Sequence, residues 1–310
     1  MIHARGLSRR FRDVDAVREL DIDITEGELV GFLGPNGAGK TTTIRMLTTL
    51  LPPTAGEATV AGCDLRTDPV GVRRRIGHVP QSGSAGADRE VGDEIRMQAR
   101  FHGLSAARAR ARCAELLGAL GLDGLDRRPV AALSGGQRRR LDIALGLAHT
   151  PRLLFLDEPS TGLDPQSRAG LWELIRELRA EHGITVLLST HYLDEADVLC
   201  DRLLVIDNGR IVATGTPDEL KQRVSGDLVL FSCSDPETAA TAVRGLPQAR
   251  DVRFDADGVR FRTDRGDEAL AALLRVVEPS RLTSLRVRRP SLDDVFLQLT
   301  GHRMEAADAA

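Results

Sequence analysis

A glycine-rich run near the start of the chain has the residue types of a phosphate-binding loop. Glycines allow backbone angles that other residues adopt only at a cost, so that successive N–H groups and the start of the next helix point at phosphate oxygens. We expect the lysine of the run to reach the β- and γ-phosphates, the first threonine to ligate Mg²⁺ and the second to contact phosphate. The run consists of Gly34, Pro35, Asn36, Gly37, Ala38, Gly39, Lys40, Thr41 and Thr42. It predicts a site for a nucleoside triphosphate and Mg²⁺.

An acidic pair closes a short apolar run further along the chain. Asp157 and Glu158 follow Leu153–Leu156, whose continuous apolar character is typical of a buried strand. Asp157 is placed to hold Mg²⁺ through water, and Glu158 to act as the base that polarises the attacking water. An acidic pair after a strand is often only the start of an exposed loop, but the succeeding run from Pro159 to Asp164 argues against that interpretation. Glu158 is therefore a candidate catalytic residue.

Between these two motifs lies a second candidate surface for phosphate, made of Leu133, Ser134, Gly135, Gly136 and Gln137. Ser134 is a suitable helix N-cap, the two glycines leave backbone N–H groups uncovered, and the helix dipole favours an anion. A simple capping turn is the alternative. Two surfaces for one γ-phosphate would be redundant in one subunit. We therefore expect a head-to-tail homodimer, in which each ATP lies between Lys40 of one protomer and Ser134 of the other.

Two further polar residues are predicted to support this site. Gln81 follows Val79-Pro80 and is expected to sense Mg²⁺ and the attacking water, as a metal ligand and catalytic residue. His191 ends a buried strand, at the edge of a parallel sheet where ligands bind. A lone histidine is more often structural, and only this position favours the functional interpretation. With Lys40 and Glu158, these residues complete the candidate catalytic set.

The elements that must position these residues follow the order strand, loop, helix. Leu29–Leu33 is a short apolar run before the glycine-rich loop, and helical spacing follows from Lys40 to Leu51. The segment from about residue 82 to 150 is rich in Ala, Arg and Leu and predicts an inserted helical subdomain. Another buried strand is expected over Ile184–Leu188. Residues 1–222 are therefore expected to form one α/β domain that binds nucleotide.

The pattern changes after about residue 225. Two strand-like runs flank Asp257-Gly258, a hairpin signal, and helices alternate with strands in the order β-α-β-β-α-β. We expect residues 226–300 to form a small C-terminal α+β domain, and residues 301–310 to be a flexible tail.

Composition restricts the classes of function. A net charge of -3 over 310 residues gives no general attraction to nucleic acid, so no nucleic-acid partner is expected. The four cysteines are scattered, which indicates neither a disulfide framework nor a cysteine metal site. No apolar run reaches the roughly 18 residues of a transmembrane helix, and the N-terminus lacks an apolar signal core. These observations predict a cytoplasmic protein that takes part in membrane processes only through a partner.

The motifs and their order resemble the ATP-binding subunits of ABC transporters. The resemblance implies a P-loop NTPase fold: an ABC nucleotide-binding domain with an inserted helical subdomain, followed by the small α+β domain. Phe11 takes the A-loop position, where the family more often has tyrosine and where an aromatic ring stacks on adenine. The other matching positions are the Walker A motif at 34–42, the Q-loop at Gln81, the signature motif at 133–137, the Walker B strand at 153–157 with Glu158, the D-loop from Ser160 to Asp164, and the switch histidine His191.

Two shorter stretches, residues 136–142 and 289–296, resemble the daunorubicin-resistance type of exporter ATPase. This resemblance implies that ATP hydrolysis powers efflux of a drug-like or other hydrophobic compound through a separate integral membrane permease. It also implies a peripheral location at the cytoplasmic face of the cell membrane.

Three other classes of protein are alternatives to an exporter ATPase. A soluble ABC-type ATPase acting on ribosomes or nucleic acid would usually carry two cassettes or a long coiled-coil insertion. A P-loop kinase or GTPase would not need residues 134–137. A non-enzymatic regulator would not need the intact site residues Lys40, Asp157, Glu158 and His191.

Overall fold

The computed structural model describes residues 1–83, 85–223, 226–255, 258–278 and 282–302. The chain divides into two compact units, one spanning Met1–Thr216 and one that begins at Pro217. Helix α8 (Pro217–Arg223) belongs to the second unit, although we expected the first domain to reach residue 222, because α8 packs against helix α11 (Leu292–Thr300).

A six-stranded sheet forms the centre of the first unit. Its order is β10-β9-β3-β8-β7-β6, and every neighbouring pair is parallel except β9 and β10, which form a hairpin. The carboxyl ends of the parallel strands therefore meet at one edge, which is where the predicted site residues follow them. The strands are β3 (Leu29–Leu33), β6 (Ile76–Val79), β7 (Leu153–Asp157), β8 (Thr185–Thr190), β9 (Arg202–Asp207) and β10 (Arg210–Gly215).

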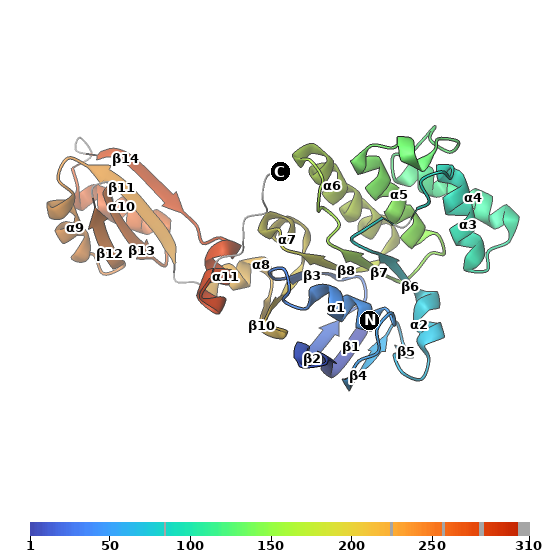
Figure 1. The fold of residues 1–310 in the computed structure, drawn as a ribbon. Helices are drawn as coiled ribbons and strands as arrows, with labels where there is room; N and C mark the ends of the chain where they lie inside the picture. The colour runs from blue at the N-terminus through green and yellow to red at the C-terminus, as the bar shows by residue number, and fades with distance from the viewer. Residues whose placement is uncertain (84, 224–225, 256–257, 279–281, 303–310) are drawn as a thin grey trace. The chain divides into compact units, whose positions relative to one another are not determined.

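Both faces of this sheet are covered, which explains why its central strands are apolar without interruption. Figure 1 shows helices α5, α6 and α7 over one face, and helix α1 with a smaller antiparallel sheet, β2-β1-β4-β5, over the other. Alternate side chains of the central strands, such as Phe32 and Phe155, pack into one hydrophobic core with side chains of the smaller sheet. The covering elements are β1 (Ile2–Phe11), β2 (Val14–Ile24), β4 (Ala55–Val60), β5 (Cys63–Asp64), α1 (Lys40–Leu47), α5 (Gly135–Leu147), α6 (Pro165–His182) and α7 (Leu193–Leu199).

The segment between β6 and β7 is helical, as predicted. Helix α3 (Val91–Phe101) packs on α4 (Ala106–Ala119) and on α5, and a short 3₁₀ helix, η1 (Val130–Ala132), precedes α5. One further helix, α2 (Pro69–Arg75), precedes β6 and was not predicted. Among the described residues, no helix is both long and apolar enough to cross a membrane.

The second unit has the predicted β-α-β-β-α-β order. Its antiparallel sheet runs β12-β13-β11-β14, and helices α9 and α10 pack on one face around Val229, Phe231 and Phe261. Asp257 of the expected hairpin and residues 303–310 of the expected tail lie outside the described residues. The elements are β11 (Asp227–Cys233), α9 (Pro236–Arg244), β12 (Arg250–Asp255), β13 (Gly258–Thr263), α10 (Gly266–Val276) and β14 (Leu282–Arg288).

Candidate functional site

The glycine-rich loop leaves β3 and enters α1 through a tightly constrained backbone. A Cβ atom on Gly34 would lie 2.3 Å from the carbonyl oxygen of Ile206, so only glycine fits beside β9. Gly39 caps α1 with a φ of 107°, in the region that favours glycine. Asn36 and Gly37 are exposed at the tip of the loop, and Ala38 is buried. The loop thus presents its backbone at the start of α1, as a phosphate-binding loop requires.

Lys40, the first residue of α1, extends back across this loop. Its Nζ donates to the carbonyl oxygens of Gly34 (2.8 Å) and Pro35 (3.0 Å) and lies 3.3 Å from Glu158 Oε1. Burial lowers the pKa of Lys40, and the carboxylates of Glu158 and Asp157 oppose that shift. The ammonium is therefore a buried cation that anionic groups must neutralise.

Asp157 and Thr41 meet at the edge of the sheet. The Thr41 hydroxyl donates to Asp157 Oδ1 over 3.1 Å, and the hydroxyl of Ser189, at the end of β8, donates to the same oxygen over 2.6 Å. Hydroxyl and carboxylate oxygens are the donors that Mg²⁺ prefers, and Mg²⁺ usually needs only one or two carboxylates beside phosphate and water. Among the described residues no cluster of three or more His, Cys, Asp or Glu could hold a metal alone. The donor set fits Mg²⁺ bound together with a nucleotide.

Glu158 is the side chain that brings the predicted residues together. Its Oε2 accepts hydrogen bonds from Gln81 Nε2 (2.9 Å) and Thr161 Oγ1 (3.2 Å) and lies 3.3 Å from His191 Nδ1. Burial alone would raise the pKa of the Glu158 carboxyl, but His191 and Lys40 outweigh burial and hold the pKa at about 2. The carboxylate is therefore ionised at neutral pH. Its backbone has a φ of 46°, in the left-handed region that non-glycine residues rarely adopt.

Residues 134–137 lie apart from this cluster. Ser134 caps α5 in a reciprocal capping box: its Oγ accepts from the Gln137 N–H (3.2 Å), and Gln137 Oε1 accepts from the Ser134 N–H (3.1 Å). The first N–H groups of the helix, at Gly135 and Gly136, have no acceptor within the helix. Among the described residues, no hydrogen bond or ion pair joins residues 134–137 to residues 34–42. One chain therefore does not bring the two phosphate-binding candidates together.

Three other predicted residues lie at the surface. Phe11, at the end of β1, has 42% of its surface exposed and lies under the Arg9 guanidinium, 4.6 Å from the ring centre. Asp164 caps α6 by accepting hydrogen bonds from the Ser167 N–H and hydroxyl, and these bonds lower the pKa of its carboxyl. Thr42 is half-buried on α1. Among the described residues, no hydrogen bond or ion pair joins the side chains of these three residues to those of Glu158 or Lys40.

Comparison with known proteins identifies the family. A family profile described as ABC transporter matches residues 17–161. Over 308 residues the chain is 45% identical to the daunorubicin/doxorubicin resistance ATP-binding protein DrrA of Streptomyces peucetius, with 97% of this chain and 92% of that protein covered. The chain belongs to the DrrA-like family of ABC transporter ATP-binding proteins. As an ABC ATPase it couples hydrolysis of ATP to transport.

Other similarities support the same assignment of this ABC ATPase. A profile for the C-terminal domain of DrrA1-3-like ATP-binding proteins matches residues 215–300. Nod factor export ATP-binding protein I of Ralstonia nicotianae is 40% identical over 309 residues, covering 98% of this chain and 95% of that protein. A bacterial ABC transporter cassette whose structure is described as dimeric has a TM-score of 0.64 and 25% identity, over 70% of this chain and 98% of the cassette. The predicted family and fold class are confirmed.

Arg139 is a buried residue of the ABC ATPase that sequence reasoning assigned no role in the site. Its guanidinium, on α5, donates to the carbonyl oxygens of Pro159 (2.8 Å), Pro80 (2.7 Å) and Asp157 (3.1 Å). Arg139 thereby links α5, whose N-cap is Ser134, to the backbone segments that carry Gln81 and Glu158. The residue belongs to a run of three arginines at 138–140, and nothing in that run distinguishes the buried one.

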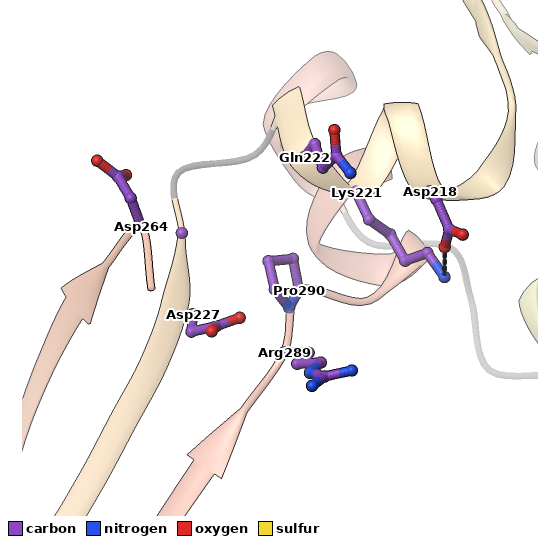
Figure 2. A pocket seen from close by; sticks show the side chains of 8 residues that line it. Asp218, Lys221, Gln222, Asp227, Asp264, Arg289 and Pro290 are labelled. Carbon is purple, nitrogen blue, oxygen red and sulfur yellow. Dashed lines mark ion pairs between the residues drawn. The ribbon is translucent and has the colours of Figure 1, made fainter. Parts of the chain in front are cut away.

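A cavity of about 570 Å³ lies in the second unit, remote in sequence from these residues. Lys221 Nζ lies 2.9 Å from Asp218 Oδ1. Both side chains line the cavity together with Asp227 and Arg289 (Figure 2). Asp227 also accepts a hydrogen bond from the Gly266 N–H over 2.9 Å. Charges of both signs line this cavity, so it shows no preference for an anionic or a cationic ligand.

We expect Arg139→Lys to destabilise the first unit by at least about 2 kcal/mol, because one ammonium cannot replace a fork that reaches three buried carbonyls. The measurement is urea unfolding followed by the fluorescence of Trp172, the only tryptophan of the chain. The control is Arg138→Lys, because the exposed Arg138 donates to a single carbonyl, that of Val130. Equal losses in the two variants would contradict the bridging role of Arg139.

The low pKa of Glu158 predicts a specific pH dependence of stability without nucleotide. A carboxyl whose folded pKa is about 2, against an ordinary 4.5, stabilises the fold fully above pH 4.5 and loses that contribution as the pH falls toward 2. Between about pH 5 and 3.5 this loss is about 1 kcal/mol. We expect Glu158→Gln to lose less stability than wild type over this interval, as measured by the same unfolding assay. Glu177→Gln, at an exposed position of α6, should retain the wild-type dependence.

Proposed function

We propose that the residues around Glu158 form the hydrolytic half-site of the ABC ATPase. The observation that carries the proposal is the convergence of Lys40, Gln81 and His191 on the Glu158 carboxylate, all within 3.3 Å. Lys40 binds the β- and γ-phosphates of the nucleotide. The Lys40 ammonium, which contacts Glu158 in the structure, is then shared between that carboxylate and the phosphates. Glu158, ionised, polarises the attacking water, while Gln81 and His191 hold its carboxylate in place.

Mg²⁺ is proposed as the cofactor, held by the Thr41 hydroxyl, by Asp157 through water and by Gln81. The 3.1 Å contact between Thr41 and Asp157 supports this assignment, since it puts two hard oxygen donors side by side. When bound, the ion neutralises charge on the β- and γ-phosphates. The chain itself orients the phosphates through the backbone of residues 34–39 and the positive end of α1. Thr42 adds a contact to phosphate.

Two protomers are proposed to close head to tail over two ATP molecules. The separation of residues 134–137 from residues 34–42 supports this arrangement, because a second copy can supply the missing surface. A similar cassette is described as dimeric. Ser134, Gly135, Gly136 and Gln137 then bind the γ-phosphate from the opposite side, and Asp164 lies at the interface. The exposed Phe11 stacks on adenine.

The proposed physiological role is export of a drug-like or other hydrophobic compound through a separate membrane permease. The names of the relatives support this role: one confers daunorubicin and doxorubicin resistance, and another exports Nod factor. A transporter needs a path through the bilayer, so we place the ABC ATPase on the cytoplasmic face of the cell membrane, bound to that permease.

Glu158→Gln is expected to bind ATP, to hydrolyse it at least about a hundredfold more slowly, and to accumulate closed dimers, because a general base commonly contributes 10² to 10⁴ in rate. Phosphate release and light scattering with Mg-ATP measure both effects. Lys40→Ala is the companion variant: it should lose tight ATP binding by calorimetry and stay monomeric with ATP. Hydrolysis by Glu158→Gln at the wild-type rate would refute the assigned role of the glutamate.

Transport is tested in inside-out vesicles that contain the ABC ATPase together with a candidate membrane permease, and in vesicles without that permease. We expect ATP to drive uptake of daunorubicin, which fluoresces, and the Glu158→Gln variant to lose that uptake. Binding of the ATPase to the vesicles should require the permease. ATP hydrolysis without ATP-dependent uptake of daunorubicin or a related hydrophobic compound would contradict the proposed export.

A further inference from the structure

A second buried carboxyl group lies outside the cluster around Glu158. Glu195, on α7, is 0% exposed, and its Oε1 accepts hydrogen bonds from the Ser160 hydroxyl and, over 3.0 Å, from Trp172 Nε1. Trp172 Nε1 also donates to Ser160 Oγ over 3.1 Å. Ser160, Trp172 and Glu195 therefore form a closed triangle of hydrogen bonds, which we call the buried cluster.

The buried cluster joins the two segments that carry Glu158 and His191. Ser160 lies two residues after Glu158, in the loop that follows β7. Glu195 lies four residues after His191, in the helix that follows β8. Trp172 is on α6, which starts where the Ser160 loop ends. Relative movement of the two segments must therefore break hydrogen bonds between buried polar groups, which is costly.

The surroundings of Glu195 disfavour a charge on it. Burial raises the pKa of its carboxyl, and hydrogen bonds from its neighbours offset only part of that shift. Its second oxygen, Oε2, has no hydrogen-bond partner among the described residues. A nearby cation, Arg168, has its guanidinium over the Tyr192 ring, 4.2 Å from the ring centre. Glutamine has the same length and keeps a carbonyl oxygen that can accept the hydrogen bonds from Ser160 and Trp172, so it is the closest substitute in shape.

We infer that Glu195 is a positioning residue for ATP hydrolysis: through Ser160 and Trp172 it holds the Glu158 segment and the His191 segment in a fixed relation. The inference rests on the roles proposed for Glu158 and His191. It concerns hydrolysis and not ATP binding, because the three side chains hydrogen-bond to one another and, within the described residues, not to residues 34–42.

The first test compares Glu195→Leu and Glu195→Gln in steady-state hydrolysis by the full chain. We expect Glu195→Leu to lower kcat at least about tenfold and Glu195→Gln less than about threefold, with the Kd for ATP within about threefold of wild type in both. The control is Leu178→Ala, at a buried apolar position of α6 beyond the cluster, chosen to give a comparable loss of Tm. A purely structural role would give Glu195→Leu and Leu178→Ala the same kcat, and that result would overturn the inference.

A milder variant keeps the test decisive if Glu195→Leu fails to fold. Ser160→Ala removes one hydroxyl and leaves the contact between Trp172 and Glu195. Because Trp172 is the only tryptophan, its fluorescence reports directly on the cluster. We expect Ser160→Ala to shift the emission of Trp172 and to lower kcat at least about fivefold, with the Kd for ATP within about threefold of wild type.

The two proposals fail in different ways. If Glu158→Gln hydrolyses ATP at the wild-type rate, the assigned hydrolytic role itself is wrong. If Glu158→Gln is inactive while Ser160→Ala has the kcat of wild type, only the positioning role of Glu195 is refuted.

Discussion

The buried Glu158 carboxylate is the group on which the rest of the site depends. Its two oxygens contact Lys40, Gln81, Thr161 and His191, which follow or belong to four separate segments of the chain. A buried carboxylate stays ionised only if charges and donors replace its lost hydration. The strands β3, β6, β7 and β8 must therefore end together at one edge, and the parallel central sheet makes them do so.

This dependence explains how much could be predicted from the sequence. Residues that directly follow apolar strands, such as Asp157 and His191, could be placed at one edge because parallel strands share their carboxyl ends. The helix expected to run from Lys40 to Leu51 ends at Leu47 instead, since Thr49 takes a left-handed φ of 63°. The strand Ile76–Val79 was not predicted, because four residues containing glycine and histidine carry too little periodicity.

The contacts that escaped prediction are those between distant segments. Arg139 bonds to the Pro80 carbonyl, 59 positions away in sequence, and Glu195 bonds to Ser160, 35 positions away. Neither spacing has a local signature, and both side chains would ordinarily be assigned to a solvated helix face. Residues 134–137 show the converse case. Their local structure is a capping turn, which both interpretations expected, and the proposed phosphate contact depends on a second protomer that no contact within one chain reveals.

The choice between lysine and arginine at the two buried cations follows from shape. Only two of the 42 basic residues are lysines, yet Lys40 occupies the gap between Gly34, Pro35 and Glu158, where a compact ammonium fits and a planar guanidinium would not. Arg139, in contrast, donates to three backbone carbonyl oxygens at once, those of Pro80, Asp157 and Pro159, which a planar guanidinium can reach. A compact ammonium can be shared between phosphate and carboxylate groups. A planar guanidinium donates in several fixed directions and can hold backbone segments in place relative to one another. In this arginine-rich chain, Lys40 lies beside the glycine-rich loop, where we propose that phosphate shares its ammonium with Glu158, and Arg139 lies where three backbone segments are held together.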